Sequence, residues 1–240
     1  MNAQMTFKRY EVKYILTRRQ RELLLQAMAG HLALDQYGRH TIRNIYFDTD
    51  TFRLVRDSIE KPFYKEKLRV RSYRRASEDS PVFVELKKKY DGVVYKRRLS
   101  LPHRAAMDAL ESGAPLPEDS QIAREIEAFR AFYGPTLMPA MLLTYEREAY
   151  YPVDGSDLRL TLDENIRWRM DNIDLSASAM GRLILPSDSV LMELKSPGGY
   201  PQWIVNFLSD NKIYKTSFSK YGTAYLQMLT EKNMGGELYA

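Results

Sequence analysis

The chain has 240 residues, with 36 Lys and Arg against 31 Asp and Glu, for a formal net charge of +5. It contains no cysteine, which excludes disulfides, thiolate zinc sites and cysteine nucleophiles. The positive charge favours acidic partners such as nucleic acid, phosphorylated metabolites or an anionic membrane. Neither a signal peptide nor a bilayer-spanning apolar stretch is present, so the sequence predicts a cytoplasmic protein with no membrane segment of its own.

The N-terminal part predicts mostly strands. The expected elements are, in chain order, a strand at residues 9–16, a helix at 17–30 and strands at 64–73, 81–89 and 93–101. Thr17 is the candidate N-cap of the helix. The strand at 64–73 sets four cations on alternate positions, which places them on one face. They are Lys65, Lys67, Arg69 and Arg71.

The C-terminal part predicts four helices and three strands. The helices are expected at residues 102–113, 120–134, 201–211 and 219–233, and the strands at 143–151, 157–165 and 190–196. Ser120 is a candidate N-cap, and Gly113 and Gly134 stand where their helices should end. The Pro- and acid-rich stretch Glu111–Ser120 is expected to be a loop.

Charged residues recur on one face of nearly every expected strand, opposite an apolar face. Besides the four cations above, they are Arg9, Glu11 and Lys13, then Glu85, Lys87 and Lys89, then Lys96 and Arg98, then Arg147, then Arg159 and Asp163, and finally Glu193 and Lys195. Aligned like charges on neighbouring strands destabilise a sheet. We therefore expect the charged faces to surround a polyanion and the apolar faces to pack against the helices.

Common catalytic and nucleotide-binding motifs are absent from the sequence. His31, His40 and His103 are far apart and lack metal-ligand spacing. There is no G-x-x-x-x-G-K-[ST] and no G-x-G-x-x-G, and Ser196–Trp203 is interpreted as a turn that leads into a helix. The sequence therefore offers neither a histidine-based nor a glycine-loop mechanism.

Nine motifs in order resemble a known family: RYEVKY, IRNIYFDT, EKLRVRSY, FVELKKK, VVYKRR, TYEREAYY, LRLTLDENI, LMELKS and SFSKY. Together they resemble the VTC (vacuolar transporter chaperone) domain, the polyphosphate polymerase branch of the CYTH-like triphosphate tunnel metalloenzymes. The resemblance runs from about Phe7 to Leu229. It implies an α+β fold in a single domain over residues 1–240, in which an antiparallel β tunnel barrel with a basic interior is flanked by helices.

The resemblance also implies site residues, position by position. Those with a catalytic role are Lys13, Arg69, Arg71, Lys87, Lys96, Arg147 and Arg159. Those that bind phosphate are Arg56, Lys215 and Lys220, where Lys215 substitutes for a late lysine whose position falls near Ser217. Glu193 is the expected ligand of a divalent metal, Mn²⁺ or Mg²⁺, and Glu11 and Glu85 are alternatives to it.

One position departs from the hydrolases and cyclases of the superfamily, which begin with E-x-E-x-K. Here Arg9 occupies the first glutamate position, before Glu11 and Lys13. Fewer carboxylates mean weaker metal-assisted activation of water, so this departure argues against triphosphatase or cyclase chemistry.

We therefore expect an ATP–polyphosphate phosphotransferase whose partners are ATP and inorganic polyphosphate, and not nucleic acid. The alternatives are a triphosphate or polyphosphate hydrolase of the same fold and a non-catalytic polyphosphate-binding module. RNA binding is a weaker alternative, because Tyr46, Tyr64, Tyr73 and Tyr95 could imitate an aromatic surface, whereas the strict alternation of charge argues against it.

Overall fold

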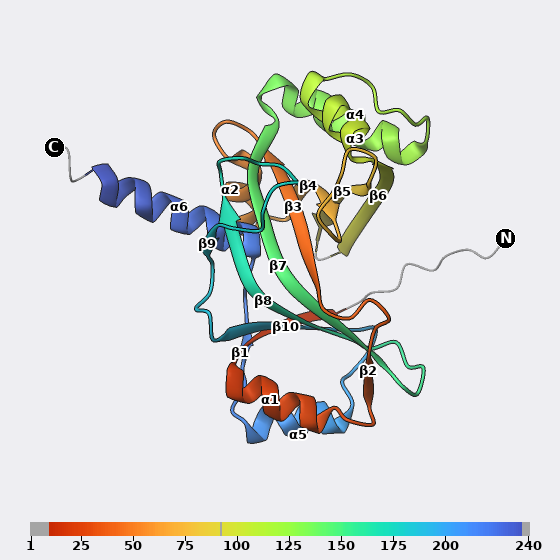
Figure 1. The fold of residues 1–240 in the computed structure, drawn as a ribbon, viewed down its shortest axis with the longest axis vertical. Coiled ribbons are helices and arrows are strands. Elements are labelled where there is room, and N and C mark those ends of the chain that lie inside the picture. The colour runs from red at the N-terminus through yellow and green to blue at the C-terminus, as the bar shows by residue number, and fades with distance from the viewer. Residues whose placement is uncertain (1–9, 92, 237–240) are drawn as a thin grey trace. The chain divides into compact units, whose positions relative to one another are not determined.

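The strands pair antiparallel and helices pack against them, which confirms the expected α+β class (Figure 1). The computed structural model describes residues 10–91 and 93–236. These residues form two compact units, each built from three separate segments. Unit 1 contains residues up to 40, 146–166 and 185–218, and unit 2 contains residues 41–145, 167–184 and those from 219 onward. Two long strands, β7 (Met138–Pro152) and β8 (Arg159–Arg169), contribute residues to both units.

In unit 1 a sheet packs against two helices. Its strands follow the order β11-β1-β10-β8-β7, and β2 pairs with β7. Their bounds are β1 (Tyr10–Thr17), β2 (Leu32–Leu34), β10 (Ser189–Ser196) and β11 (Lys215–Thr216). The helices α1 (Arg18–Ala27) and α5 (Gln202–Asp210) lie side by side (Figure 1).

The core of unit 1 contains the apolar face that the alternation predicted. Leu16 of β1, Leu160 of β8 and Leu194 of β10 pack in one cluster with Leu24 of α1 and Phe207 of α5. Because side chains alternate along a strand, the charged residues between these positions project from the other face.

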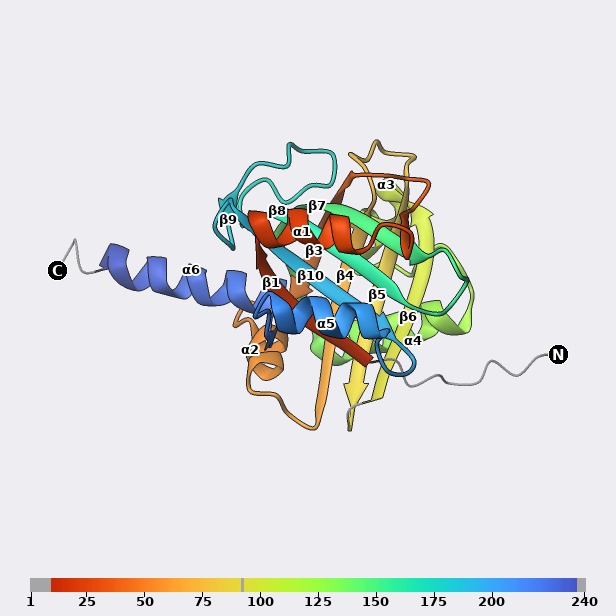
Figure 2. The same cartoon turned by 90° about the horizontal axis from the view of Figure 1, so that it is seen from below.

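In unit 2 the strand order is β7-β3-β4-β5-β6, and β9 pairs with β8. Figure 2 shows β4, β5 and β6 side by side. The strands are β3 (His40–Asp48), β4 (Tyr64–Ser72), β5 (Pro81–Tyr90), β6 (Val93–Pro102) and β9 (Arg182–Leu183). The helices are α2 (Arg53–Ile59), α3 (His103–Ser112), α4 (Gln121–Tyr133), η1 (Gly134–Thr136) and α6 (Lys220–Gly236).

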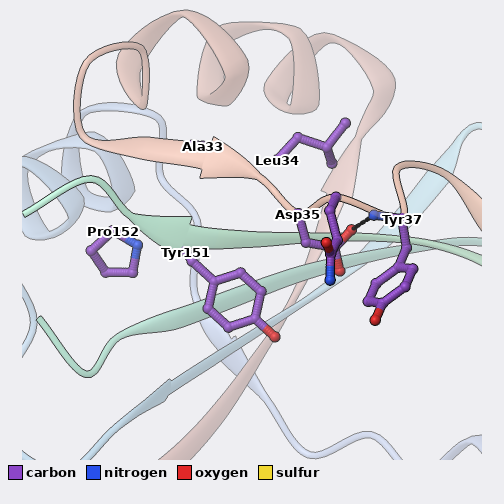
Figure 3. Close-up of a pocket in the computed structure, with 7 residues that line it drawn as sticks. Ala33, Leu34, Asp35, Tyr37, Tyr151 and Pro152 are labelled. Atoms are coloured by element: carbon purple, nitrogen blue, oxygen red, sulfur yellow. Dashed lines mark hydrogen bonds between the residues drawn. The ribbon is translucent and has the colours of Figure 1, made fainter. Parts of the chain in front are cut away.

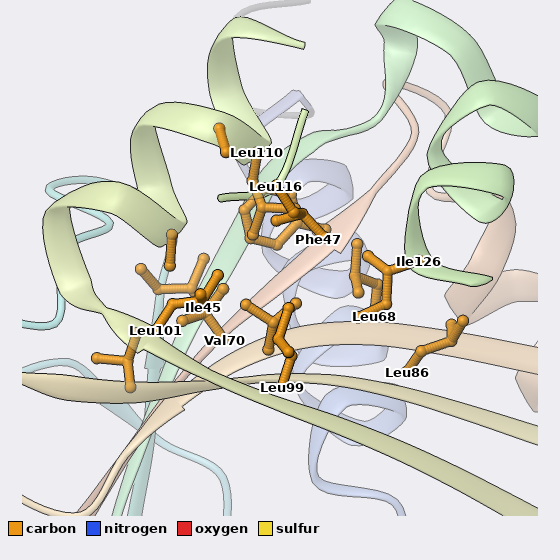
Figure 4. Packing of buried hydrophobic residues seen from close by; sticks show 14 of the residues in the cluster. Ile45, Phe47, Leu68, Val70, Leu86, Leu99, Leu101, Leu110, Leu116 and Ile126 are labelled. Atoms are coloured by element: carbon orange, nitrogen blue, oxygen red, sulfur yellow. The ribbon is translucent and has the colours of Figure 1, made fainter. Parts of the chain in front are cut away.

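The core of unit 2 lies between the apolar sheet face and the segment that contains α3 and α4 (Figure 4). Val70, Leu86 and Leu99 come from three neighbouring strands and pack in one cluster with Leu110 of α3 and Ile126 of α4. Burial of each such side chain contributes about 1.5–3 kcal/mol to folding. The apolar half of the alternation therefore fixes which face of β4, β5 and β6 is left for the cations.

The predicted helix caps at Thr17, Ser120 and Gly113 are confirmed. The first helix ends at Ala27 and not at the expected Gly30. Thr17 forms a capping box with Gln20, whose backbone N–H donates to the Thr17 hydroxyl at 3.2 Å. Ser120 accepts from the backbone N–H of Ala123 at 3.2 Å. Gly113 ends α3 with φ +80°, a conformation that glycine adopts without strain. The expected loop begins at Gly113 and not at Glu111, because α3 continues through Ser112.

One helix, α2, was not predicted, because seven residues are too few to show apolar periodicity. It is held by Asp48, which is fully buried at the end of β3. The Asp48 carboxylate accepts from the backbone N–H groups of Leu54 at 2.8 Å and Val55 at 3.0 Å. The Tyr221 hydroxyl of α6 donates to it at 2.8 Å. One carboxylate therefore ties α2 and α6 to the sheet of unit 2.

None of the helices in residues 10–91 and 93–236 combines the length and the hydrophobicity needed to span a bilayer.

Candidate functional site

In unit 2 a single buried carboxylate joins cations from three strands. Glu85 of β5 is 1% exposed and lies opposite Arg69 of β4 and Arg98 of β6. Its Oε2 accepts from Arg69 Nε at 2.7 Å, and its Oε1 accepts from Arg98 Nε at 2.7 Å and lies 2.8 Å from Lys96 Nζ. Arg71 Nε is 3.9 Å from Oε2. We call these five residues the Glu85 cluster.

Burial acts to raise the pKa of Glu85, but the charges of Arg69, Arg71 and Lys96 outweigh it and hold the pKa well below its ordinary value. Glu85 is therefore ionised at neutral pH. It neutralises one of the four cations around it, so the Glu85 cluster keeps a positive surplus.

The same face of β4, β5 and β6 carries further aligned lysines. Lys67, Lys87 and Lys96 lie directly opposite one another in the register, and Lys65 lies opposite Lys89. Burial and the charges of Lys89 and Lys87 lower the pKa of Lys65. Like charges in such positions destabilise a sheet. In these three strands, all of whose residues are described, eight cations share a face on which Glu85 is the one acid.

Polar side chains from other strands orient Arg71 and Arg69. Arg71 is buried, and its Nε donates to Asn44 Oδ1 at 2.8 Å while its Nη2 donates to the Tyr145 hydroxyl at 3.2 Å. Lys220 Nζ lies 4.8 Å from the centroid of the Tyr145 ring. These contacts bring Lys220, at the start of α6, to the Arg71 side of the Glu85 cluster.

Tyr46 of β3 is the aromatic contact of Arg69. Arg69 Nη1 donates to the Tyr46 hydroxyl at 3.1 Å, and the Tyr46 ring stacks on Tyr221 with centroids 4.5 Å apart. Burial alone would raise the pKa of Tyr46, but the charges of Arg69, Lys67 and Arg71 lower it to about 8. The cations therefore favour a phenolate at a position where an isolated tyrosine would be neutral.

In unit 1 charges of both signs alternate across two strands. Lys13 lies opposite Glu193, and Glu11 lies opposite Lys195. Lys13 Nζ is 3.3 Å from Glu11 Oε1 and 3.6 Å from Glu193 Oε1. Lys195 Nζ is 3.4 Å from Glu11 Oε2 and 3.5 Å from Glu193 Oε2. We call these four residues the Glu193 cluster, in which both carboxylates contact both lysines at ion-pair distances.

The neighbouring strands β7 and β8 add two arginines and a hydroxyl. Arg147 forms a bidentate pair with the buried Asp163, with both N···O distances at 2.6 Å, and its Nη2 is 3.7 Å from Glu193 Oε2. Thr161 lies opposite Glu193, and its buried hydroxyl has no hydrogen-bond partner among the described residues. The buried Nε of Arg159 also has none there.

The structure therefore brings most of the predicted site residues together within each unit. Arg69, Arg71 and Lys96 belong to the Glu85 cluster, with Lys87 and Lys220 beside it. In unit 1, Lys13 and Glu193 belong to the Glu193 cluster, Arg147 contacts Glu193, and Arg159 lies opposite Lys195.

Two predicted phosphate-binding residues are not brought into these clusters. Arg56 lies exposed on α2 and forms no side-chain hydrogen bond or ion pair with a described residue. Lys215 lies opposite Tyr14, so it shares the face of Tyr14, whereas Thr216 lies opposite Lys13. Arg9, the residue that replaces the first family glutamate, lies outside the described residues.

Arg98, Tyr46, Asn44 and Lys67 were not among the predicted catalytic or phosphate-binding residues. Arg98 and Lys67 were placed by alternation on the charged faces expected to surround a polyanion, but the family motifs gave them no individual role. Asn44 and Tyr46 also alternate, in the stretch RNIYF, but β3 is buried along most of its length and carries no repeated charge there. Only the contacts with Arg71 and Arg69 reveal their part in the site.

A cavity of about 410 Å³ in unit 1 has a different character (Figure 3). Leu34, Tyr37, Tyr151 and Pro152 line it together with Asp35, and none of its lining residues is a cation. Arg159 lies on the Tyr151 ring, 5.3 Å from its centroid. The residues that line this cavity therefore offer no positive charge of their own to an anion.

The comparisons with known proteins identify the family. Residues 8–229 match the family model described as VTC domain. The chain belongs to the VTC domain family. No curated protein sequence matches it.

Two solved structures share the fold of this VTC domain protein. A candidate adenylate cyclase from Bacillus halodurans has a TM-score of 0.54 at 17% identity, covering 88% of this chain and 95% of that chain. A candidate adenylyl cyclase from Hippeastrum, described as having a dominant triphosphatase activity, has a TM-score of 0.54 at 20% identity, covering 88% and 92%. Their likeness shows that the chain shares this antiparallel α+β fold, as the motifs implied. Among the described residues the sheet does not close into the expected barrel, because its strand order runs from β11 to β6 with no pairing between these two end strands.

We expect one tyrosine of this VTC domain protein to ionise near pH 8, about two units below an ordinary tyrosine. The pKa of Tyr46 is lower in the folded state than in the unfolded state, so ionised Tyr46 stabilises the fold at alkaline pH. This contribution to the free energy of unfolding is lost as pH falls through about 8. Ultraviolet absorbance during a pH titration measures the phenolate.

In that titration, Tyr46→Phe should remove the early step, and Tyr37→Phe, at an exposed position, should keep it. Tripolyphosphate should move the step to higher pH, because bound anions offset the charges of Arg69 and Arg71. A wild-type chain in which every tyrosine ionises above about pH 9.5 would contradict this account of the cluster.

Proposed function

We propose that this chain is a metal-dependent polyphosphate polymerase, which transfers the γ-phosphate of ATP to a growing chain of inorganic polyphosphate. The observation that supports this most is the positive surplus of the Glu85 cluster: Arg69, Arg71, Lys96 and Arg98 contact one carboxylate. Membership of the VTC domain family supports it independently.

The residues suit phosphoryl transfer because that reaction asks a protein mainly for positioning and charge stabilisation. Arg69 and Arg71 are held by Tyr46, Asn44 and Tyr145, so their guanidinium planes are oriented before any phosphate arrives. Arginine binds phosphate oxygens through two parallel N–H groups, whereas lysine acts as a point charge. The attacking group is a terminal phosphate oxygen, which is already ionised at neutral pH, so the reaction needs no general base.

The divalent metal of this proposal, of the Mg²⁺ or Mn²⁺ type, would bind at the carboxylates of the Glu193 cluster. Such an ion takes one or two carboxylates and fills its remaining positions with phosphate oxygens and water. Glu193 and Glu11 can supply the carboxylates. The Thr161 hydroxyl, which has no hydrogen-bond partner among the described residues, stands opposite Glu193. The described residues hold no group of three or more His, Asp or Glu side chains placed to bind a metal. When bound, the ion would neutralise negative charge that develops on the transferred phosphoryl group.

Hydrolysis of triphosphate is the second candidate, because the Hippeastrum neighbour is described as a triphosphatase. The sequence argues against hydrolysis at one position, since Arg9 stands where the hydrolases carry a glutamate. The third candidate function is that of a module that binds polyphosphate without turning it over.

Incubation of the purified chain with ATP and Mn²⁺ or Mg²⁺, followed by analysis of both products, tests the proposal. We expect ADP and long phosphate chains that appear in equal phosphate equivalents. Orthophosphate as the main product would replace the polymerase with a hydrolase. Tight binding of tripolyphosphate with no turnover of ATP would leave only the binding module.

Glu193→Gln tests the metal ligand. The amide keeps the shape of the side chain but lacks the charge that offsets a divalent ion, so we expect turnover of ATP to fall by about 100-fold or more. Binding of tripolyphosphate without metal should persist, because Lys13 and Lys195 remain. The matched control is Glu146→Gln, next to Arg147 on the opposite face of β7. Equal turnover in the Glu193 variant and wild type would transfer the metal role to Glu11 or Glu85.

A further inference from the structure

Three arginines of unit 2 gather away from the Glu85 cluster. Arg43 lies on β3, Arg75 follows the end of β4, and Arg169 is the last residue of β8. Arg43 is a neighbour of Asn44 in the strand, so its side chain projects from the other face of β3. That face carries Ile45, which belongs to the hydrophobic core. The sheet itself therefore separates Arg43 from Arg69 and Arg71, which contact Tyr46 and Asn44 on the other face.

Arg43 is buried, with 7% of its surface exposed. Among the described residues its buried Nε has no hydrogen-bond partner, and no carboxylate forms an ion pair with it. A buried arginine is normally paired, because transfer of an uncompensated charge from water into a protein is costly. Among the described residues no negative charge compensates the Arg43 guanidinium, so an anion bound beside it would be favourable.

Arg75 and Arg169 are both held by the segment between β8 and β9. Arg75 Nε donates to the Ser176 carbonyl oxygen. Arg169 donates to the carbonyl oxygens of Met180 at 3.2 Å and Asn172 at 3.0 Å. The backbone N–H of Ala76 also donates to the Leu175 carbonyl oxygen at 3.2 Å, which ties the residue after Arg75 to the same segment.

These carbonyl contacts orient the guanidinium groups but do not neutralise them. The buried Nε of Arg169, like that of Arg43, has no partner among the described residues. Arg43 lies opposite Ser72 in the register of β3 and β4, and Ser72 is three residues before Arg75. Burial and the positive charges of Arg75 and Arg169 lower the pKa of Arg43, so each of these two arginines repels Arg43. A carbonyl accepts a hydrogen bond, but only an anion removes this repulsion.

We propose that Arg43, Arg75 and Arg169 form a second anion site, which binds a phosphate group as inorganic phosphate or as the end of a phosphate chain. Planar guanidinium groups match the oxygens of a phosphate through paired N–H donors. A phosphate carries up to two negative charges at neutral pH and offers several oxygens, so one group can serve more than one arginine. The site rests on its own contacts and does not depend on whether the chain polymerises phosphate.

The test is calorimetric titration of the full chain in an Arg71→Gln background, which weakens the Glu85 cluster. The probes are orthophosphate and tripolyphosphate in separate titrations. Adding Arg75→Gln should lower the affinity of the remaining site by about tenfold or more, as expected for loss of a charge-assisted bidentate donor. Arg75 is exposed, so this variant should fold. The matched control is Arg74→Gln, the adjacent exposed arginine, with a change of less than about twofold.

A second readout uses the buried member of the site. In buffer without phosphate, Arg43→Met should unfold at a temperature equal to or above that of the parent chain, because an uncompensated charge is removed. The rise in unfolding temperature that orthophosphate produces in the parent should disappear. Affinity for tripolyphosphate but not for orthophosphate would assign the site to a chain end, and affinity for both would assign it to single phosphate groups. Equal losses in the Arg74 and Arg75 variants, or an unchanged phosphate response in Arg43→Met, would overturn the proposal.

Discussion

The ion pairs around Glu85 are the interaction on which the rest of the site depends. Glu85 lies on the central one of three strands, and its two oxygens accept from Arg69 on one side and Arg98 on the other. Without this carboxylate, cations aligned across β4, β5 and β6 would only repel one another. With it, the arginines are fixed in direction while the face remains positive. A polyanion can bind without prior rearrangement only where the positive side chains are already held in place, as they are on this sheet face.

The same alternation that aligns the cations also supplies the stability that offsets their repulsion. On β4 the residues between the cations include Leu68 and Val70, both fully buried in the core. Each buried side chain of this kind contributes about 1.5–3 kcal/mol, whereas like-charge pairs on a wet strand face cost at most about 1 kcal/mol each. The hydrophobic face therefore determines the register, and the charged face follows from it. Unit 1 follows the same rule, with Leu160 and Leu194 in the core and the Glu193 cluster on the other face.

Period-two alternation and helix caps made most elements of the fold predictable, because both depend on neighbours in sequence. The same alternation predicted the shared face of Arg69 and Arg71. What alternation and caps did not predict depends on tertiary contacts. The helix α2 begins where Asp48 accepts hydrogen bonds from the backbone N–H groups of residues six and seven positions later. No local sequence pattern predicts these contacts. The side of Lys215 follows from a two-residue pairing with β1. The alternation of charged and apolar residues does not predict the proposed Arg43 site. Arg43 lies on the same strand face as Ile45, so in the sequence it is a single charged residue within an apolar face.

The central claim is that one face of the β4, β5 and β6 strands binds a phosphate chain, and two adjacent arginines of β6 test it most directly. Arg98 contacts Glu85, whereas Arg97 projects from the other face and pairs with Glu125 of α4 at 2.8 Å. The measurement is the affinity for tripolyphosphate at fixed salt of Arg98→Gln and Arg97→Gln, which lose the same charge. The account predicts a loss of about tenfold or more for Arg98→Gln and less than about twofold for Arg97→Gln. Equal losses in the two variants would mean that only net charge matters, and would contradict the account.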